Sequence, residues 1–224
     1  MKIENEESGK TRILLVEDHP MFRERLAELI DEEPDMEVCG QADNVSEAME
    51  LARRLKPGVA IVDITLKGVN GLEFIKDLQA QGIPLPVLVL SMHEESLYAE
   101  RVLQAGARGY VSKSRESSEV MKAVRQVVAG EVYVSQEVTA NLLRRMTGTG
   151  ATSGGIGMQS LSDRELEVFQ LIGSGRSMHE ISEIMNLSPS TVESYRTRVR
   201  SKLGVKNAAS LYTVAATWVR DKGS

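Results

Sequence analysis

The chain has 224 residues, more than the ~100 to 200 of one typical domain, so its length favours two compact units. Hydrophobic residues make up 42% and charged residues 26% of the sequence, a composition that excludes a disordered chain. No apolar run approaches the ~18 residues that a membrane-spanning helix needs, and the charged segment 1–10 lacks the apolar core of a signal peptide. The single cysteine, Cys39, cannot form an internal disulfide. We therefore expect a cytoplasmic protein without a membrane segment.

Charge is divided unequally along the chain. Residues 1–158 carry 18 basic and 25 acidic side chains, a net charge of -7, whereas residues 159–224 carry 9 basic and 7 acidic side chains, a net charge of +2. Between these parts, residues 147–160 contain five glycines and no charge, which is typical of a flexible linker. The sequence thus predicts a first domain over residues 1–132, a connecting helix with its linker over residues 133–160, and a second domain over residues 161–224.

Before the linker, short apolar runs alternate with segments of helical periodicity. The runs, each typical of a buried strand, cover residues 13–16, 38–42, 59–62, 87–90 and 109–111. The helical segments that follow them cover residues 22–30, 48–55, 72–78, 97–105 and 120–128. Parallel strands need crossover connections, so this alternation predicts a doubly wound α/β domain, a five-stranded parallel sheet covered by helices on both faces.

Polar side chains stand where these apolar runs end. Glu17 and Asp18 follow the first run, Asp63 follows the third, Ser91 follows the fourth, and Lys113 comes shortly after the fifth. Ligands of such sheets bind beyond the carboxyl ends of the strands, so these side chains should meet in one pocket. Neighbouring carboxylates repel one another, and Mg²⁺ with its preference for oxygen ligands relieves that repulsion. A carboxylate beside Mg²⁺ and a lysine can attack a phosphoryl group and hold it as an acyl phosphate.

This set of strand-end residues resembles the receiver domain of bacterial two-component response regulators, which has a flavodoxin-like fold. The resemblance extends over about residues 11–130. It implies that a cognate histidine kinase transfers a phosphoryl group to Asp63. It also implies that Asp18, Asp63 and the backbone carbonyl of Thr65 hold Mg²⁺, with Glu17 acting largely through water.

Tyr110, three residues before Lys113, adds to the resemblance. The resemblance implies that Ser91 and Tyr110 form a switch pair and that Lys113 contacts the phosphate. Lys67 departs from the family pattern, since many receivers carry proline at that position. His93 follows Ser91 by two residues and is either a residue at the mouth of the pocket or a solvated loop histidine.

After the linker, the sequence predicts a small all-α domain. The sequence contains three helix-start signals, each with a serine that can cap the helix and a glutamate or proline after it. They are Ser162 with Glu165, Ser177 with Glu180, and Ser188 with Pro189. They begin helices that end near residues 173, 185 and 203, and a fourth helix covers about residues 208–219. Two helices joined by a tight turn, the second of them basic, predict a helix-turn-helix.

The third helix of this domain has distinct faces. At 100° per residue, Val192, Tyr195, Val199 and Leu203 fall on one side and form the predicted core face. Residues 196–202 carry four cations and no anion, which suits double-stranded DNA, where short side chains reach base edges and arginines contact phosphates. The candidate DNA contacts are Ser190, Thr191, Glu193, Ser194, Arg196, Thr197, Arg198, Arg200 and Lys202.

Residues 161–214 resemble the LuxR-type helix-turn-helix of NarL/FixJ response regulators. The motifs that carry this resemblance are Leu161-Ser162, Arg164-Glu165, Val168, Glu180-Ile181, Ser190-Thr191-Val192 and Lys202-Leu203-Gly204-Val205. With a receiver in front, the resemblance implies a phosphorylation-controlled transcription regulator that binds DNA as a homodimer. Glu193 stands where the family often carries lysine, and its carboxylate can accept a hydrogen bond from a cytosine amine.

The resemblance implies a regulator and not an enzyme, although some hydrolysis of its own phosphoaspartate is expected. One alternative is a haloacid-dehalogenase-like phosphatase, but that chemistry needs a general acid where this chain has Thr65. Another alternative is a receiver that acts through protein contacts without DNA. A steep salt dependence of DNA binding would exclude it.

Two routes from phosphorylation to DNA binding are open. The receiver either covers the third helix until it is phosphorylated, or phosphorylation drives the pairing of two chains. Leu211, Val214, Ala215 and Trp218 of the fourth helix form either a self-complementary face or a packing face within their own domain.

Overall fold

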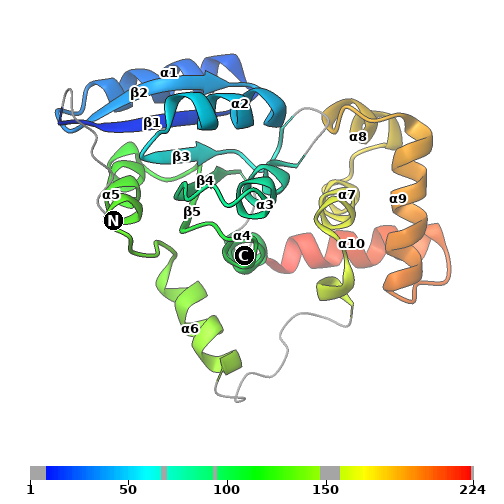
Figure 1. Cartoon of the computed structure of the whole chain (residues 1–224). Helices are drawn as coiled ribbons and strands as arrows, with labels where there is room; N and C mark the ends of the chain where they lie inside the picture. The colour runs from blue at the N-terminus through cyan, green and yellow to red at the C-terminus, as the bar shows by residue number, and fades with distance from the viewer. Residues whose placement is uncertain (1–8, 67–69, 93–94, 147–156, 223–224) are drawn as a thin grey trace. The chain divides into compact units, whose positions relative to one another are not determined.

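The computed structural model forms two compact units, Met1–Thr149 and Gly150–Ser224, and each is described by itself. The described residues are 9–66, 70–92, 95–146 and 157–222. Figure 1 shows the helices and strands of both units. Most of the predicted linker, residues 147–156, lies outside the described residues, so its flexibility stays a prediction. Among the described residues, every helix falls short of the length and apolar character that a membrane span requires.

The first unit is built on a sheet in which every pair of neighbouring strands is parallel. Its strands are β1 (Thr11–Val16), β2 (Met36–Ala42), β3 (Val59–Val62), β4 (Val87–Ser91) and β5 (Gly109–Ser112). Their order in the sheet is β2-β1-β3-β4-β5. The chain therefore passes from β1 to β2 on one side of β1 and then crosses over to β3 on the other side of β1. The carboxyl ends of β1 and β3 lie at this switch point, where such folds bind ligands.

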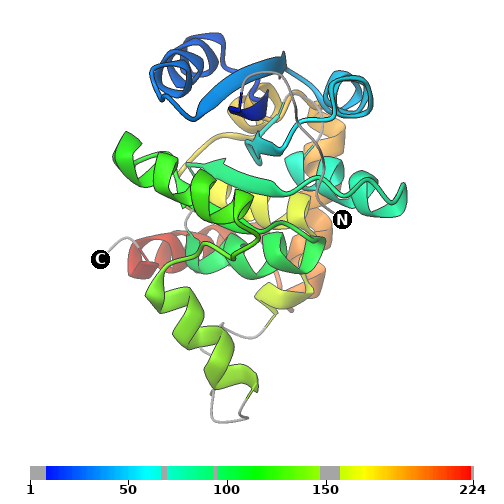
Figure 2. The same cartoon turned by 60° about the vertical axis from the view of Figure 1, so that its left-hand side comes forward.

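Helices cover both faces of the sheet, as the alternation in the sequence predicts (Figures 1 and 2). The helices of the first unit are α1 (Pro20–Asp31), α2 (Val45–Leu55), α3 (Gly71–Ala80), α4 (Glu95–Ala105), α5 (Ser117–Val128) and α6 (Gln136–Met146). On one face, Leu26 of α1 and Val124 of α5 join Ile13, Ile61 and Leu88 of the sheet in one apolar cluster. The predicted doubly wound α/β fold is confirmed.

The other face packs against α2. A Cβ atom added to Gly40 of β2 would meet the side chains of Leu14, Leu51 and Leu55, which shows how closely α2 approaches β1 and β2. All residues of β3 and β4 are buried, as central strands covered on both faces require. Each fully buried aliphatic side chain of these strands contributes about 1.5 to 3 kcal/mol to folding.

The second unit contains helices only, among its described residues. They are the 3₁₀ helix η1 (Met158–Ser160) and the α-helices α7 (Asp163–Gly173), α8 (Met178–Ile184), α9 (Pro189–Lys202) and α10 (Ala208–Lys222). Both predicted capping boxes are present, at Ser162 and Ser177, and Ser188 caps α9 as expected. The turn between α8 and α9 contains Asn186 with a φ of 50°, a left-handed conformation that asparagine tolerates. Gly204, with a φ of 65°, follows the C-terminal cap of α9.

Helices α7, α8 and α9 enclose a small core. Val192 and Val199 of α9 are fully buried, whereas Tyr195 and Leu203 on the same side of the helix are only half-buried. The predicted core face is therefore correct at its centre, and Tyr195 lies at the edge of the core.

Helix α10 packs against α7. Leu211 and Ala215 are fully buried, and the ring of Trp218 lies edge-on to the ring of Phe169, with 5.5 Å between the ring centroids. Three of the four residues considered as a self-complementary face thus pack within their own domain, while Val214 is exposed. Leu211 and Ala215 are therefore not accessible to a partner chain, whereas Val214 is exposed, so pairing of two chains along α10 stays a prediction.

Candidate functional sites

The strand-end residues of the first unit gather at the carboxyl edge of the sheet. Glu17 and Asp18 follow β1, Asp63 follows β3, and Ser91 ends β4, and all four are less than a tenth exposed. Three buried carboxylates in one pocket carry a large desolvation penalty unless cations compensate their charge.

Lys113, just after β5, supplies part of that compensation. Its Nζ donates hydrogen bonds to Glu17 Oε2 at 2.6 Å and to Asp63 Oδ2 at 2.7 Å. The ammonium also lies 4.3 Å from the centroid of the Phe22 ring, a cation–π contact that holds the lysine over the pocket. Phe22 was not among the predicted site residues. Its signal is weak, because one aromatic residue in the first turn of an amphipathic helix is ordinarily part of the core.

One lysine does not neutralise three carboxylates. Burial raises the pKa of Glu17 above its ordinary value, and the neighbouring Asp63 carboxylate raises it further, while Lys113 acts in the opposite direction. The pocket therefore has an excess of negative charge that favours an additional cation.

The geometry around Asp18 fits a divalent cation. Asp18 Oδ1 is buried and accepts no hydrogen bond from the described residues, which leaves one carboxylate oxygen available as a ligand. Ligand atoms of Glu17, Asp18, His19 and Asp63 all lie within 4.8 Å of one another. The three carboxylates of this group are hard oxygen donors, which suit Mg²⁺. The residues present thus fit the ion that the sequence predicts.

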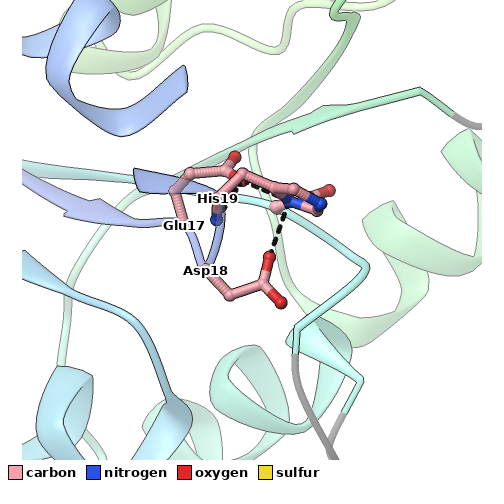
Figure 3. A group of neighbouring side chains, drawn as sticks. Glu17, Asp18 and His19 are labelled. Atoms are coloured by element: carbon pink, nitrogen blue, oxygen red, sulfur yellow. Dashed lines mark hydrogen bonds and ion pairs between the residues drawn. The ribbon is translucent and has the colours of Figure 1, made fainter. Parts of the chain in front are cut away.

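His19, which follows Asp18 directly in the sequence, also belongs to this cluster. It is the N-cap residue of α1, but its side chain makes no capping hydrogen bond. Instead, its Nδ1 lies 2.8 Å from Asp18 Oδ1 and 3.1 Å from Glu17 Oε1, as Figure 3 shows. Its position next to two acidic residues was the only signal in the sequence.

The segment after Asp63 is shaped by close backbone contacts. The backbone N–H of Thr65 donates to Asp63 Oδ1 at 3.2 Å, and the N–H of Gly71 donates to the Ile64 carbonyl at 2.7 Å. A Cβ on Gly71 would lie 1.9 Å from the Asp63 carbonyl oxygen, so only glycine fits there. Asn70 caps α3 by accepting the Leu72 N–H at 2.9 Å. These contacts orient the Asp63 carboxylate. Lys67 lies outside the described residues.

Ser91 and Tyr110 occupy neighbouring strands, β4 and β5. Both side chains are almost completely buried, with Tyr110 1% exposed. The backbone N–H of Lys113 donates to the Ser91 carbonyl at 2.9 Å, which ties the lysine loop to the end of β4. The switch role of the pair stays a prediction, and His93 lies outside the described residues.

In the second unit, α9 presents most of the candidate DNA contacts to solvent. The exposed ones are Ser190, Glu193, Ser194, Thr197, Arg198 and Lys202, and the half-buried ones are Thr191, Arg196 and Arg200. A shallow hollow of about 340 Å³ is lined by Ser190, Thr191, Ser194, Tyr195 and Arg198. The guanidinium of Arg198 lies 5.6 Å from the Tyr195 ring centroid, so the half-buried aromatic ring supports the cation at the surface.

Two of the candidate cations for DNA binding, Lys202 and Arg196, are engaged within the unit. Lys202 Nζ donates to Glu165 Oε2 at 2.6 Å and to the Ser160 carbonyl at 2.9 Å. Arg196 Nη2 donates to Glu193 Oε1 at 2.6 Å. Burial acts to lower the pKa of Arg196, but its hydrogen bonds to Glu193 and Tyr212 outweigh that effect and raise it. These cations hold helices together and orient Glu193, whereas Arg198 has no such ion pair among the described residues.

The two units match two known families in the same order. Residues 13–125 match the response regulator receiver domain, and residues 159–215 match the bacterial regulatory proteins of the luxR family. The transcription regulator BvgA of Bordetella pertussis is 37% identical over 204 residues, covering 91% of this chain and 96% of BvgA. The response regulator GacA of Pseudomonas aeruginosa is 32% identical and covers 91% of this chain and 94% of GacA.

The fold is also shared with a solved structure. The structure of RcsB from Salmonella enterica serovar Typhimurium, bound to the promoter rprA, has a TM-score of 0.60 and 23% identity and covers 92% of this chain and 98% of RcsB. The fold and the pocket thus define a receiver joined to a LuxR-type DNA-binding domain. The chain belongs to the NarL/FixJ family of two-component response regulators, and it is a DNA-binding regulator of transcription.

Proposed function

We propose that Asp63 is the phosphoacceptor, that a divalent cation assists the transfer, and that phosphorylation controls DNA binding by α9. The observation that carries this proposal is the placement of Asp63. Its buried carboxylate accepts a hydrogen bond from Lys113 and lies in the same pocket as Glu17 and Asp18.

The transfer follows from these contacts. An Asp63 carboxylate oxygen attacks the phosphorus of a phosphohistidine in the kinase, a P–O bond forms, and the P–N bond breaks with its electron pair going to the imidazole. The Lys113 ammonium, already 2.7 Å from Asp63, stays to contact the incoming phosphoryl oxygens. Asp18, Asp63 and the Thr65 carbonyl would hold Mg²⁺, with Glu17 acting through water. The ion supplies charge neutralisation for the phosphoryl oxygens.

Intact-mass measurement tests the acceptor. The full chain is incubated with phosphoramidate and MgCl₂, and the wild type should gain one phosphoryl group. Asp63→Asn should gain none, because an amide is a poor nucleophile, whereas Asp77→Asn, which changes an exposed aspartate of α3, should behave as the wild type. Full labelling of Asp63→Asn would place the acceptor elsewhere.

The proposed output is double-stranded DNA bound by two chains. Support comes from the exposed hydroxyl groups and Arg198 on α9, and from the relatives, since RcsB has been solved as dimers on DNA. Ser190, Thr191, Glu193, Ser194 and Thr197 face the base edges in this proposal. Arg198 and Arg200 contact phosphates, while Arg196 and Lys202 act mainly by positioning.

Comparing three samples separates the two routes of control. DNA affinity and molar mass are measured for the full chain with and without phosphorylation and for the segment 159–224. Tighter DNA binding by the isolated segment than by the unphosphorylated full chain would support release of a covered helix. A phosphorylated chain that dimerises on DNA would support pairing, and one that stays monomeric would exclude it.

A further inference from the structure

At the rim of the acidic pocket, a histidine nitrogen lies next to a buried carboxylate oxygen. His19 Nδ1 is 2.8 Å from Asp18 Oδ1 and 3.1 Å from Glu17 Oε1, and the buried Asp18 Oδ1 accepts no hydrogen bond among the described residues. Both oxygens of Glu17 are engaged, Oε1 by the backbone N–H of His19 and Oε2 by Lys113. Asp63 is likewise bonded to Lys113 and Thr65. Asp18 Oδ1 and the nitrogen of the exposed His19 ring, which can leave its contact with Glu17, are therefore the pair best placed to receive an ion.

The spacing of this pair is that of two ligands on one metal ion. For metal–ligand bonds of about 2.1 Å, neighbouring donors in an octahedral site lie about 3.0 Å apart. The side chain of Asp18 is 7% exposed and that of His19 is 67% exposed. One donor is thus fixed in the protein interior, and the other can turn toward an ion that enters from solvent.

We propose that His19 is a metal ligand at this pocket and makes it select first-row transition ions, Ni²⁺, Zn²⁺ and Mn²⁺, over Mg²⁺. Imidazole nitrogen suits these borderline ions, whereas Mg²⁺ prefers an all-oxygen shell. A site built from carboxylates alone discriminates less between these transition ions and Mg²⁺, because it offers no nitrogen ligand. The inference rests on the cation pocket of the proposed function and adds to it the class of ion that the pocket prefers.

Calorimetric titration of the full chain with NiCl₂ and with MgCl₂ tests the inference. His19→Gln should weaken Ni²⁺ binding about tenfold or more and leave Mg²⁺ binding within about twofold, since only the nitrogen donor is lost. The matched control is His179→Gln, because His179 is also an exposed histidine beside a glutamate, with Nε2 3.4 Å from Glu183 Oε1. This control should bind both ions as the wild type does.

Two results would overturn the inference. If His19→Gln weakens Ni²⁺ and Mg²⁺ binding equally, His19 only organises the carboxylates. If His19→Gln weakens the binding of neither ion, His19 is not a metal ligand. Thermal melting of each variant checks that the fold is retained.

A spectroscopic measurement reads the ligand directly. Pulsed electron paramagnetic resonance of the Mn²⁺-loaded wild type should show modulation from a bound ¹⁴N nucleus, and His19→Gln should lose it. Nitrogen modulation that persists in His19→Gln would contradict the assignment. The phosphorylation assay on Asp63 tests the proposed function independently of this metal-binding inference. A chain that binds Ni²⁺ through His19 but gains no phosphoryl group on Asp63 would leave this inference standing and overturn the acceptor.

Discussion

Glu95, in the first turn of α4, accepts a hydrogen bond of 2.6 Å from the backbone N–H of Ser135, which lies just before α6. The hydroxyl of Ser135 in turn accepts the N–H of Val138 at 3.2 Å and so caps α6. Tyr133, two residues earlier, pairs with β5 at Gly109 and donates its hydroxyl to Glu119 of α5. The segment that leads into α6 is thus hydrogen-bonded to α4, α5 and β5, and β5 contains Tyr110.

Removing the acceptor at Glu95 should loosen α6 without changing the pocket. In Glu95→Ala, amide hydrogen exchange in residues 136–146 should accelerate about fivefold, equivalent to the loss of about 1 kcal/mol from one hydrogen bond. Labelling of Asp63 by phosphoramidate should stay at the wild-type level. Gln104→Ala, which changes an exposed residue of the same helix, serves as the control and should leave exchange in α6 unchanged. Equal exchange in both variants would show that Glu95 does not hold α6.

Gly71→Ala should destabilise the first unit. The added methyl group would lie 1.9 Å from the Asp63 carbonyl oxygen, and its three nearest neighbours are all backbone atoms of Asp63 and Ile64, which cannot turn aside as a side chain can. We expect a loss of about 2 to 3 kcal/mol in the free energy of unfolding, together with reduced phosphorylation, because Asp63 itself must shift. Urea unfolding followed by far-ultraviolet circular dichroism measures the loss. Gly58→Ala, whose added Cβ meets only ordinary contacts from 3.6 Å, should stay within about 0.5 kcal/mol of the wild type.

The Glu165–Lys202 pair should make the stability of the second unit depend on pH. Burial acts to raise the pKa of Glu165, but the hydrogen bonds from Lys202 and from the Ser162 backbone outweigh it and lower the pKa. Because the pKa of Glu165 is lower in the folded state than in the unfolded chain, its charge stabilises the fold fully at pH values above the unfolded-state pKa. This stabilisation is lost as the pH falls through the folded-state pKa. Glu165→Gln should therefore cost about 1 kcal/mol at pH 7, and the difference from the wild type should shrink below about pH 4.

Trp218 provides the measurement for this pair. It is the single tryptophan of the sequence and packs against Phe169, so its fluorescence reports urea unfolding of the second unit within the full chain. Glu183→Gln, which changes an exposed glutamate of α8, is the control and should show no such pH-dependent difference. A difference between Glu165→Gln and the wild type that stays constant from pH 7 into acid would refute the role of charge.

Residues of α9 should divide into two groups by their effect on DNA binding. Arg198→Ala should weaken binding to every duplex alike and flatten the logarithmic salt dependence by about one unit, because one phosphate contact is lost. Glu193→Ala should instead change the preference at one base pair by about 1 to 3 kcal/mol, since its carboxylate is held in place by Arg196. Fluorescence anisotropy across a salt series and a selection from random duplexes measure the two effects.

The control for this comparison is Arg25→Ala, which removes an exposed arginine of α1 paired with Glu28 and should leave DNA binding unchanged. Uniform weakening of all sequences by Glu193→Ala would show that this residue does not face a base.

The sequence by itself determined the order of strands and helices, the caps of α7, α8 and α9, and the strand-end set of Glu17, Asp18, Asp63, Ser91 and Lys113. These features depend on local rules: apolar runs and helical periodicity determine the elements, capping serines begin the helices, and parallel strands bring their carboxyl ends to one edge. Such patterns act over a few residues and can be recognised without knowing which distant segments meet.

Only the tertiary structure decided which side chains face one another. Lys202 could contact DNA or Glu165, Trp218 could lie in an interface or against Phe169, and His19 could cap α1 or face Asp18, because each is compatible with its own helix. The choice depends on contacts between segments far apart in the chain, or on rotamers that the surrounding pocket selects. Lys202 and Glu165, for example, are 37 residues apart, and no periodicity of either helix predicts their 2.6 Å contact.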